Sequence, residues 1–151
     1  MGFLNDGVAG KDLTAVSTDA TETVGAIFTG SDGVYQYAKA EGAITAGWAA
    51  IIDENGDATA ATTTLSGSLP CAIGIACATF ADEEYGWFWR GCGVFEAIVT
   101  NGAAAGALTT TASDGILGTG GDSVAGARNV DAGVTATRVT IFASQLMATN
   151  S

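Results

Sequence analysis

Hydrophobic and polar residues alternate over much of the chain with the period of two that is typical of β-strands. Two such segments, 24–28 and 34–39, flank a turn signal at 31–33. Tyr35 and Tyr37 fall on one side of the second segment, because successive side chains of a strand point to opposite faces. The pattern predicts a β-hairpin.

A further strand is predicted over 44–52. Its apolar face comprises Ile44, Trp48, Ala50 and Ile52. The segment ends at a turn over 53–57 that contains Asn55-Gly56, the strongest short hairpin signal because both residues tolerate positive φ.

The segment 71–79 predicts a strand with two different faces. One face carries Cys71, Ile73, Ile75 and Cys77, and the other carries the small residues Ala72, Gly74, Ala76 and Ala78. We expect the first face to fill a core. The small-residue face would allow another layer or another subunit to approach closely.

The most hydrophobic stretch is 85–100, in which the glycines around Cys92 predict a bulge or a sharp bend. Tyr85, Trp87 and Trp89 share one side of it. Two interpretations stay open: both faces of this strand are core, or one face contacts a partner subunit or a carbohydrate. After it, the pattern predicts short strands at 108–111 and 116–117, a flexible Gly-rich loop over 118–126 and a last strand over 134–143.

Residues 1–23 are polar and poorly periodic, and we expect them to form an extended N-terminal arm ahead of a domain over 24–151. The predicted fold class is all-β: a compact β-barrel or sandwich of short antiparallel strands. Helix is disfavoured by the 22 glycines and the many threonines. The low charged fraction argues against disorder.

The formal net charge is −11, from 16 acidic and 5 basic residues. So few bases argue against nucleic acid and against an anionic membrane surface as partners. Only 69–81 is convincingly apolar, which is too short to span a bilayer. Cys71, Cys77 and Cys92 have no zinc-site or redox spacing, so we expect reduced, buried thiols.

No motif for chemistry emerges, and we predict no catalytic, cofactor-binding or metal-binding residues. Histidine, the commonest general base, is absent. The acidic turn at 53–57 lacks the glycine position and the closing glutamate of a calcium loop. Neighbouring acids at Asp82, Glu83 and Glu84 are expected to point apart into solvent, without a second acid across a groove.

Several segments together resemble a tailed-phage virion protein. They are 31–40, 43–47 (Ala-Ile-Thr-Ala-Gly), 73–76 (Ile-Gly-Ile-Ala) and 85–87 (Tyr-Gly-Trp). The chain is similar, over roughly 24–118, to the small decoration (cement) proteins of double-stranded DNA phage capsids, in the group with a β-tulip-like barrel. The resemblance implies a structural protein on the outer capsid surface, bound to the major capsid protein and often trimeric.

We therefore expect a non-enzymatic virion protein that stabilises the outer capsid surface, made in the host cytoplasm because the N-terminus lacks the basic start of a secretory signal. The alternative is a host-recognising adhesin or fibre-associated carbohydrate-binding module. Expected partners are the major capsid protein and other copies of the chain, as a homotrimer. The interface candidates are Phe3, Leu4, Val8, Leu13 and Val16 of the arm, Ala72, Gly74 and Ala76 of the small-residue face, and Tyr85, Trp87 and Trp89.

Overall fold

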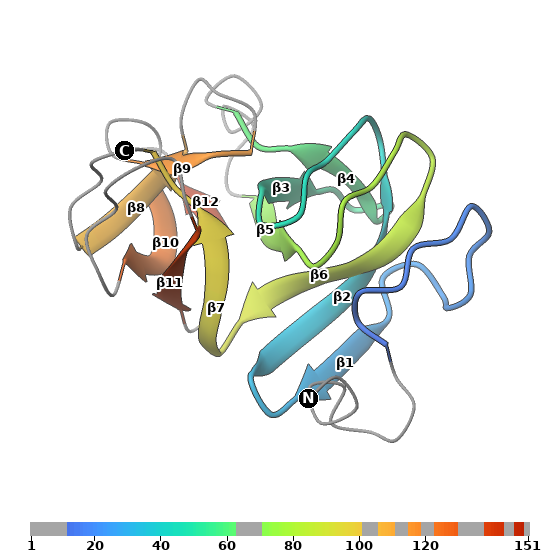
Figure 1. The fold of residues 1–151 in the computed structure, drawn as a ribbon, viewed down its shortest axis with the longest axis horizontal. Helices are drawn as coiled ribbons and strands as arrows, with labels where there is room; N and C mark the ends of the chain where they lie inside the picture. The colour runs from blue at the N-terminus through green and yellow to red at the C-terminus, as the bar shows by residue number, and fades with distance from the viewer. Residues whose placement is uncertain are drawn as a thin grey trace.

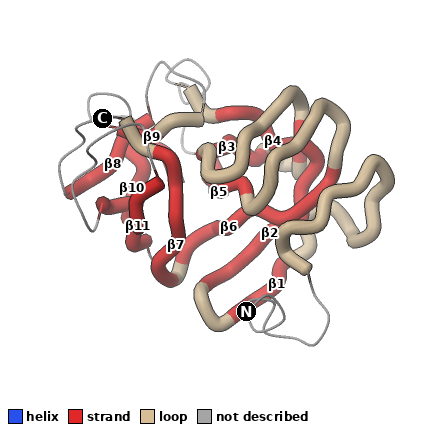
Figure 2. Tube along the Cα trace, in the orientation of Figure 1, coloured by secondary structure: helices blue, strands red, loops and turns tan. Residues whose placement is uncertain are grey.

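The computed structural model describes residues 12–62, 71–100, 106–110, 115–118, 123–129, 138–143 and 147–149. Throughout these residues the chain forms strands, turns and bends, and no helix (Figure 2). The predicted all-β fold class is confirmed.

A closed barrel of five strands forms one part of the molecule (Figure 1). Its strands are β2 (Gly33–Ala40), β3 (Ala49–Ile52), β4 (Asp57–Ala60), β5 (Cys71–Ala76) and β6 (Tyr85–Gly91). They follow in the order β2-β4-β3-β5-β6, and β6 pairs again with β2. The pairs are antiparallel as predicted except for β2 and β4, which are parallel. The strand β1 (Ile27–Gly30) extends the barrel by pairing with the first half of β2.

The remaining strands continue the sheet beyond the barrel. They are β7 (Gly93–Ile98), β8 (Gly106–Thr110), β9 (Leu117–Gly118), β10 (Ser123–Asn129), β11 (Arg138–Ala143) and β12 (Met147–Thr149). The order runs β5-β12-β10-β11-β7, with β8 paired to both β10 and β9. Figure 1 shows them gathered beside the barrel, with β7 following directly on β6.

The predicted loop and strand boundaries are wrong in two places. Residues 123–129 are strand β10, although 118–126 was predicted as a flexible Gly-rich loop. The predicted strand 44–52 is regular only over 49–52, because Ile44 makes an isolated bridge to Phe80 instead. Backbone pairing to three neighbouring strands holds β10 in the sheet despite its glycine.

Small side chains fill the interior of the barrel. Its buried cluster contains Ala38, Ala40, Ile44, Ala50, Ile52, Ala58, Ala76, Phe80 and Phe88. Phe80 and Phe88 stack with ring centroids 5.0 Å apart and occupy much of the space. A barrel of only five strands is narrow, so alanine and glycine at alternate positions let its walls approach one another. The predicted apolar face of 44–52 lies on this interior.

The opposite faces of the same strands form a second core outside the barrel. In the β2–β6 pair Tyr35 lies across from Trp89, and Tyr37 from Trp87. These aromatics pack with Ile73 and Ile75 of β5 and with Ala97, Val99 and Leu117 beyond the barrel. Both faces of β2, β5 and β6 are therefore buried, which explains why 85–91 carries so many large apolar residues.

Replacement of Gly74 by leucine is expected to destabilise the single chain. A Cβ at Gly74 would lie 2.8 Å from Cβ of Phe88 and 3.0 Å from Cδ1 of Ile52, inside the barrel. Overpacking of this kind typically costs about 1–3 kcal/mol. Thermal unfolding of Gly74→Leu should show a clearly lower Tm. Ala72→Leu, a change at a half-buried position on the same strand face, should cost less.

An unchanged Tm for Gly74→Leu would mean that this face is not enclosed by the chain's own barrel.

Candidate functional site

The predicted N-terminal arm divides into two parts. Phe3, Leu4 and Val8 lie outside the described residues. Leu13 is only 7% exposed and belongs to the outer core, whereas Val16 is 36% exposed.

Residues 12–23 are tied to the barrel by hydrogen bonds. The backbone N–H of Tyr85 donates to the Ser17 carbonyl at 2.8 Å, and the backbone N–H of Thr21 donates to the Tyr37 hydroxyl at 3.1 Å. The segment from 12 to 23 therefore packs on the domain and does not extend from it as a free arm. Leu13 is not available as a peg for another protein.

Two truncated chains should show how much the packed segment 12–21 contributes to stability. A chain beginning at Glu22 loses the buried Leu13 and the Ser17–Tyr85 bridge, so we expect a loss of at least about 2 kcal/mol of stability. The matched control begins at Asp12, so it keeps Leu13 and the Ser17–Tyr85 bridge and should be the more stable of the two truncated chains. Denaturant unfolding of both chains measures the difference, and equal stability would show that 12–21 contributes nothing to the core.

The small-residue face of β5 lies on the interior of the barrel. Gly74 is buried, Ala76 is 1% exposed and Ala72 is half-buried. This location corrects the expectation that the face receives another subunit, because the chain's own Phe88 and Ile52 already occupy the space in front of it. Of the two possibilities that the sequence left open, another layer or another subunit, the structure shows a layer of the same chain.

The aromatic side of β6 is core as well. Trp87 is 4% exposed and Trp89 is fully buried, while Tyr85 is half-buried. Trp89 stacks on Phe95 of β7 with centroids 5.2 Å apart. Of the two interpretations left open by the sequence, core on both faces is the arrangement found.

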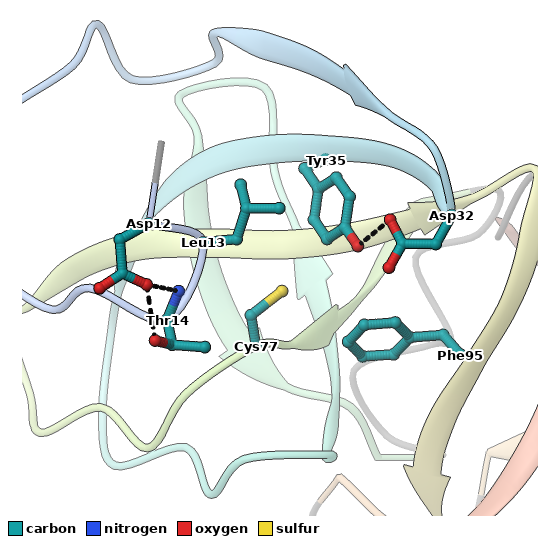
Figure 3. A pocket seen from close by; sticks show the side chains of 7 residues that line it. All are labelled: Asp12, Leu13, Thr14, Asp32, Tyr35, Cys77 and Phe95. Carbon is teal, nitrogen blue, oxygen red and sulfur yellow. Dashed lines mark hydrogen bonds between the residues drawn. The ribbon is translucent and has the colours of Figure 1, made fainter. Parts of the chain in front are cut away.

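A small pocket of about 140 Å³ lies where the 12–14 segment meets the β1–β2 turn. Its lining comprises Asp12, Leu13, Thr14, Asp32, Tyr35, Cys77 and Phe95 (Figure 3). The Tyr35 hydroxyl donates to Oδ1 of Asp32 at 2.7 Å. The Asp32 carbonyl accepts from Nε1 of Trp89 at 3.1 Å, so the turn is fastened to β6.

Burial raises the pKa of the two protonated groups of this pocket, the Tyr35 phenol and the Cys77 thiol. Burial, together with the hydrogen bond to Asp32, raises the pKa of Tyr35, so the phenol stays a neutral donor. Burial also raises the pKa of Cys77 strongly, and the nearby charge of Asp32 adds to the effect. A thiol is nucleophilic as the thiolate, and the raised pKa disfavours the thiolate of Cys77.

The two carboxylates of the pocket are not placed to share a metal ion. Asp12 and Asp32 lie at opposite ends of the row of side chains in Figure 3, with Leu13, Tyr35 and Cys77 between them. Asp12 accepts hydrogen bonds from the Thr14 hydroxyl and backbone N–H, which lower the pKa of its carboxyl. Within the part of the chain that the structure describes, no three metal-ligating side chains come together.

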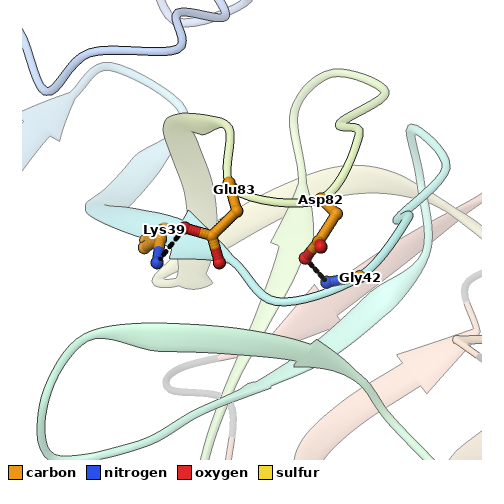
Figure 4. Close-up of polar contacts among 4 residues, drawn as sticks. All are labelled: Lys39, Gly42, Asp82 and Glu83. Atoms are coloured by element: carbon orange, nitrogen blue, oxygen red, sulfur yellow. Dashed lines mark hydrogen bonds and ion pairs between the residues drawn. The ribbon is translucent and has the colours of Figure 1, made fainter.

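The acidic turn at 82–84 uses its carboxylates to fasten loops (Figure 4). Glu83 forms an ion pair with Lys39 at 2.5 Å, and Asp82 accepts from the Gly42 backbone N–H at 2.7 Å. Glu84 accepts from the Ala81 N–H at 2.7 Å. The three acids point apart, as expected, but each of them engages a partner within the chain instead of pointing only into solvent.

The turn at 53–57 is the predicted hairpin, between the antiparallel strands β3 and β4. Gly56 has a φ of +85°, and the Asp53 carboxylate accepts from the N–H groups of Asn55 and Asp57. Burial works to raise the pKa of Asp53, but these hydrogen bonds outweigh it and lower the pKa. The carboxylate is thus a turn cap.

The cysteines differ from the expectation of three buried thiols. Cys77 is largely enclosed, but Cys92 is exposed and has a positive φ of 66°. Cys92 stands between β6 and β7, where the predicted sharp bend is confirmed. The side chain of Cys71 lies outside the described part.

A second pocket, of about 320 Å³, opens at one end of the barrel and is lined by Ile27, Val34, Arg90 and Cys92. Sequence reasoning did not single out Arg90 or this pocket. The available signal was a lone base within an apolar strand, directly before the Gly91-Cys92-Gly93 bend.

A comparison with protein-family models gave no match, and a comparison with curated proteins found no similar sequence. Among the described residues there is no helix long and apolar enough to cross a bilayer.

Proposed function

We propose that the protein is a non-catalytic structural component of a phage virion that decorates and stabilises the outer surface of the capsid. Support comes from the resemblance of 24–118 to phage decoration proteins and from the compact all-β architecture. In the first pocket, the Tyr35 and Cys77 groups serve packing and turn geometry, which is consistent with a structural role.

One structural observation carries this proposal: β1 is an edge strand with an accessible side. Among the described residues β2 is the only strand that pairs with β1. Ile27 on β1 is 59% exposed, although isoleucine is a residue that usually becomes buried. An exposed strand edge is a template for pairing with another chain, because its unpaired N–H and C=O groups can extend the sheet.

The negative charge of the chain is consistent with a position on the outer surface of a capsid filled with DNA. The chain carries a net charge of −11, so packaged DNA would repel it. The partners in this proposal are the major capsid protein and other copies of the chain in a trimer. Phe3, Leu4 and Val8, which precede the packed segment, remain the proposed anchor to the capsid.

The adhesin alternative loses the observation on which it depended. Stacking on a sugar requires an accessible aromatic face, and Trp87 and Trp89 are buried.

The β1 edge is tested by a charge placed on it. Ile27→Lys should leave the Tm nearly unchanged, because the side chain is mostly exposed, and should weaken co-sedimentation with undecorated capsids by about tenfold or more. Val94→Lys adds the same charge at an exposed valine on β7 and serves as the control. The chain beginning at Asp12 tests the anchor in the same assay. Full binding by Ile27→Lys would remove β1 from the interface.

A further inference from the structure

Arg90 occupies an unusual position at one end of the barrel. The register between β2 and β6 shifts there: Tyr35 lies across from Trp89, but Val34 lies across from Gly91. Arg90 is thus the extra residue of a β-bulge. Bulges re-aim side chains and are frequent beside functional sites. The Cδ atom of Arg90 lies 3.6 Å from where a Cβ of Gly74 would be, so its stem lies over the barrel interior.

The guanidinium of Arg90 is half-buried and incompletely paired. Nη1 donates to Oε1 of Gln36, a neutral partner. Nε is buried and has no hydrogen-bond partner among the described residues. Burial lowers the pKa of Arg90, and in the described part of the chain no carboxylate offsets that effect. Burying a charge without an opposite charge costs free energy, so an anion bound beside the Arg90 guanidinium would offset that cost.

The surroundings of Arg90 define the kind of anion. Arg90 lines the 320 Å³ pocket together with the aliphatic side chains of Ile27 and Val34. That volume lies within the range of small-molecule sites. With Nη1 engaged by Gln36, the Nε and Nη2 donors form the remaining edge of the fork, which matches the two oxygens of a carboxylate.

We propose that this end of the barrel binds a small amphiphilic carboxylate, with its carboxylate on Arg90 and its aliphatic chain against Ile27 and Val34. The proposal does not depend on capsid binding, although Ile27 belongs both to this pocket and to the β1 edge proposed for capsid contact. The apolar lining supplies affinity for the chain, and the guanidinium selects for the charged head group. An uncharged molecule with the same chain would leave the guanidinium unpaired and bind more weakly.

Calorimetric titration of the full-length protein tests the site, with octanoate as the probe and 1-octanol and acetate as controls. Octanoate should bind with a stoichiometry of one, and each control at least about tenfold more weakly, as expected for loss of the charged pair or of the apolar contact. Arg90→Met should weaken octanoate binding by at least about tenfold. Arg138→Met makes the same change in net charge elsewhere and should leave binding unchanged.

Cys92 provides a second readout that requires no substitution at Arg90. Because Cys92 is exposed and lines the pocket, bound octanoate should slow its alkylation by a maleimide, scored by peptide mass spectrometry, and acetate should not. Absence of octanoate binding, equal binding of octanoate and octanol, or unchanged binding by a folded Arg90→Met protein would each overturn the proposal. If Arg90→Met fails to fold, unprotected Cys92 in the native chain would overturn it instead.

Discussion

Trp89→Ala is expected to cost about 3–5 kcal/mol of stability, a large fraction of the total for a domain of this size. Trp89 is fully buried, stacks on Phe95 and lies across from Tyr35 in the β2–β6 pair. Its removal would leave a cavity between the barrel and β7. Denaturant unfolding followed by circular dichroism should show the loss as a lower midpoint at unchanged slope.

Trp89→Phe is the matched control. It keeps an aromatic ring beside Phe95 but removes the Nε1–H that donates to the Asp32 carbonyl. Loss of a single buried hydrogen bond and a modest volume predicts a clearly smaller cost than that of the alanine variant. Equal costs for the two substitutions would show that the ring packing contributes little.

Gly33→Ala is expected to destabilise the protein by about 3 kcal/mol or more. Gly33 has a φ of +143°, a region essentially restricted to glycine. A Cβ there would also overlap the indole nitrogen of Trp89 and the carbonyl oxygen of Gly91. Strain and overlap each cost about 1–3 kcal/mol, and the backbone carbonyl cannot move aside as a flexible side chain could.

Gly42→Ala is the control that introduces backbone strain without atomic overlap. Gly42 also has a positive φ, +93°, but a Cβ at that position would meet no atom within 4 Å. Its Tm should therefore fall by less than that of Gly33→Ala. If Gly33→Ala and Gly42→Ala have the same Tm, the contact between the β1–β2 turn and β6 is looser than the structure shows.

Alternation along the chain predicts much of the barrel. The hairpin of β1 and β2, the turn at Asn55-Gly56 and the two-faced pattern of β5 all follow from local chemistry. These features depend on residues that are close together in the sequence, so the pattern of a single sequence is enough to predict them. The burial of Tyr35 and Tyr37 on one side of β2 follows for the same reason.

Features that depend on distant segments are the ones sequence reasoning missed. A row of small residues signals close approach, and it cannot distinguish another subunit from the opposite wall of a narrow barrel. Leu13 looked like part of a free arm because the surface that buries it is assembled from later strands. The strand β10 was missed because its pairing comes from three separate strands and not from its own pattern.

Among the candidate sites, too, some conclusions follow from the sequence and others depend on distant segments that the fold brings together. The absence of histidine and the lack of a nucleophile motif argued against catalysis from composition alone. The Arg90 pocket needed the bulge in β6, the Gln36 partner on β2 and Ile27 on β1 to be brought together. No local spacing encodes that meeting of three strands.

The central proposal, that the chain decorates a phage capsid, is tested most directly by its copy number in particles. Quantitative mass spectrometry of virions purified from a phage whose genome carries this gene would give the molar ratio of the chain to the major capsid protein. If the chain is a decoration protein, the ratio should lie within a few-fold of one. The chain should also be released when the proteins on the outer surface of the capsid are stripped off. A handful of copies per particle, or none, would contradict the account.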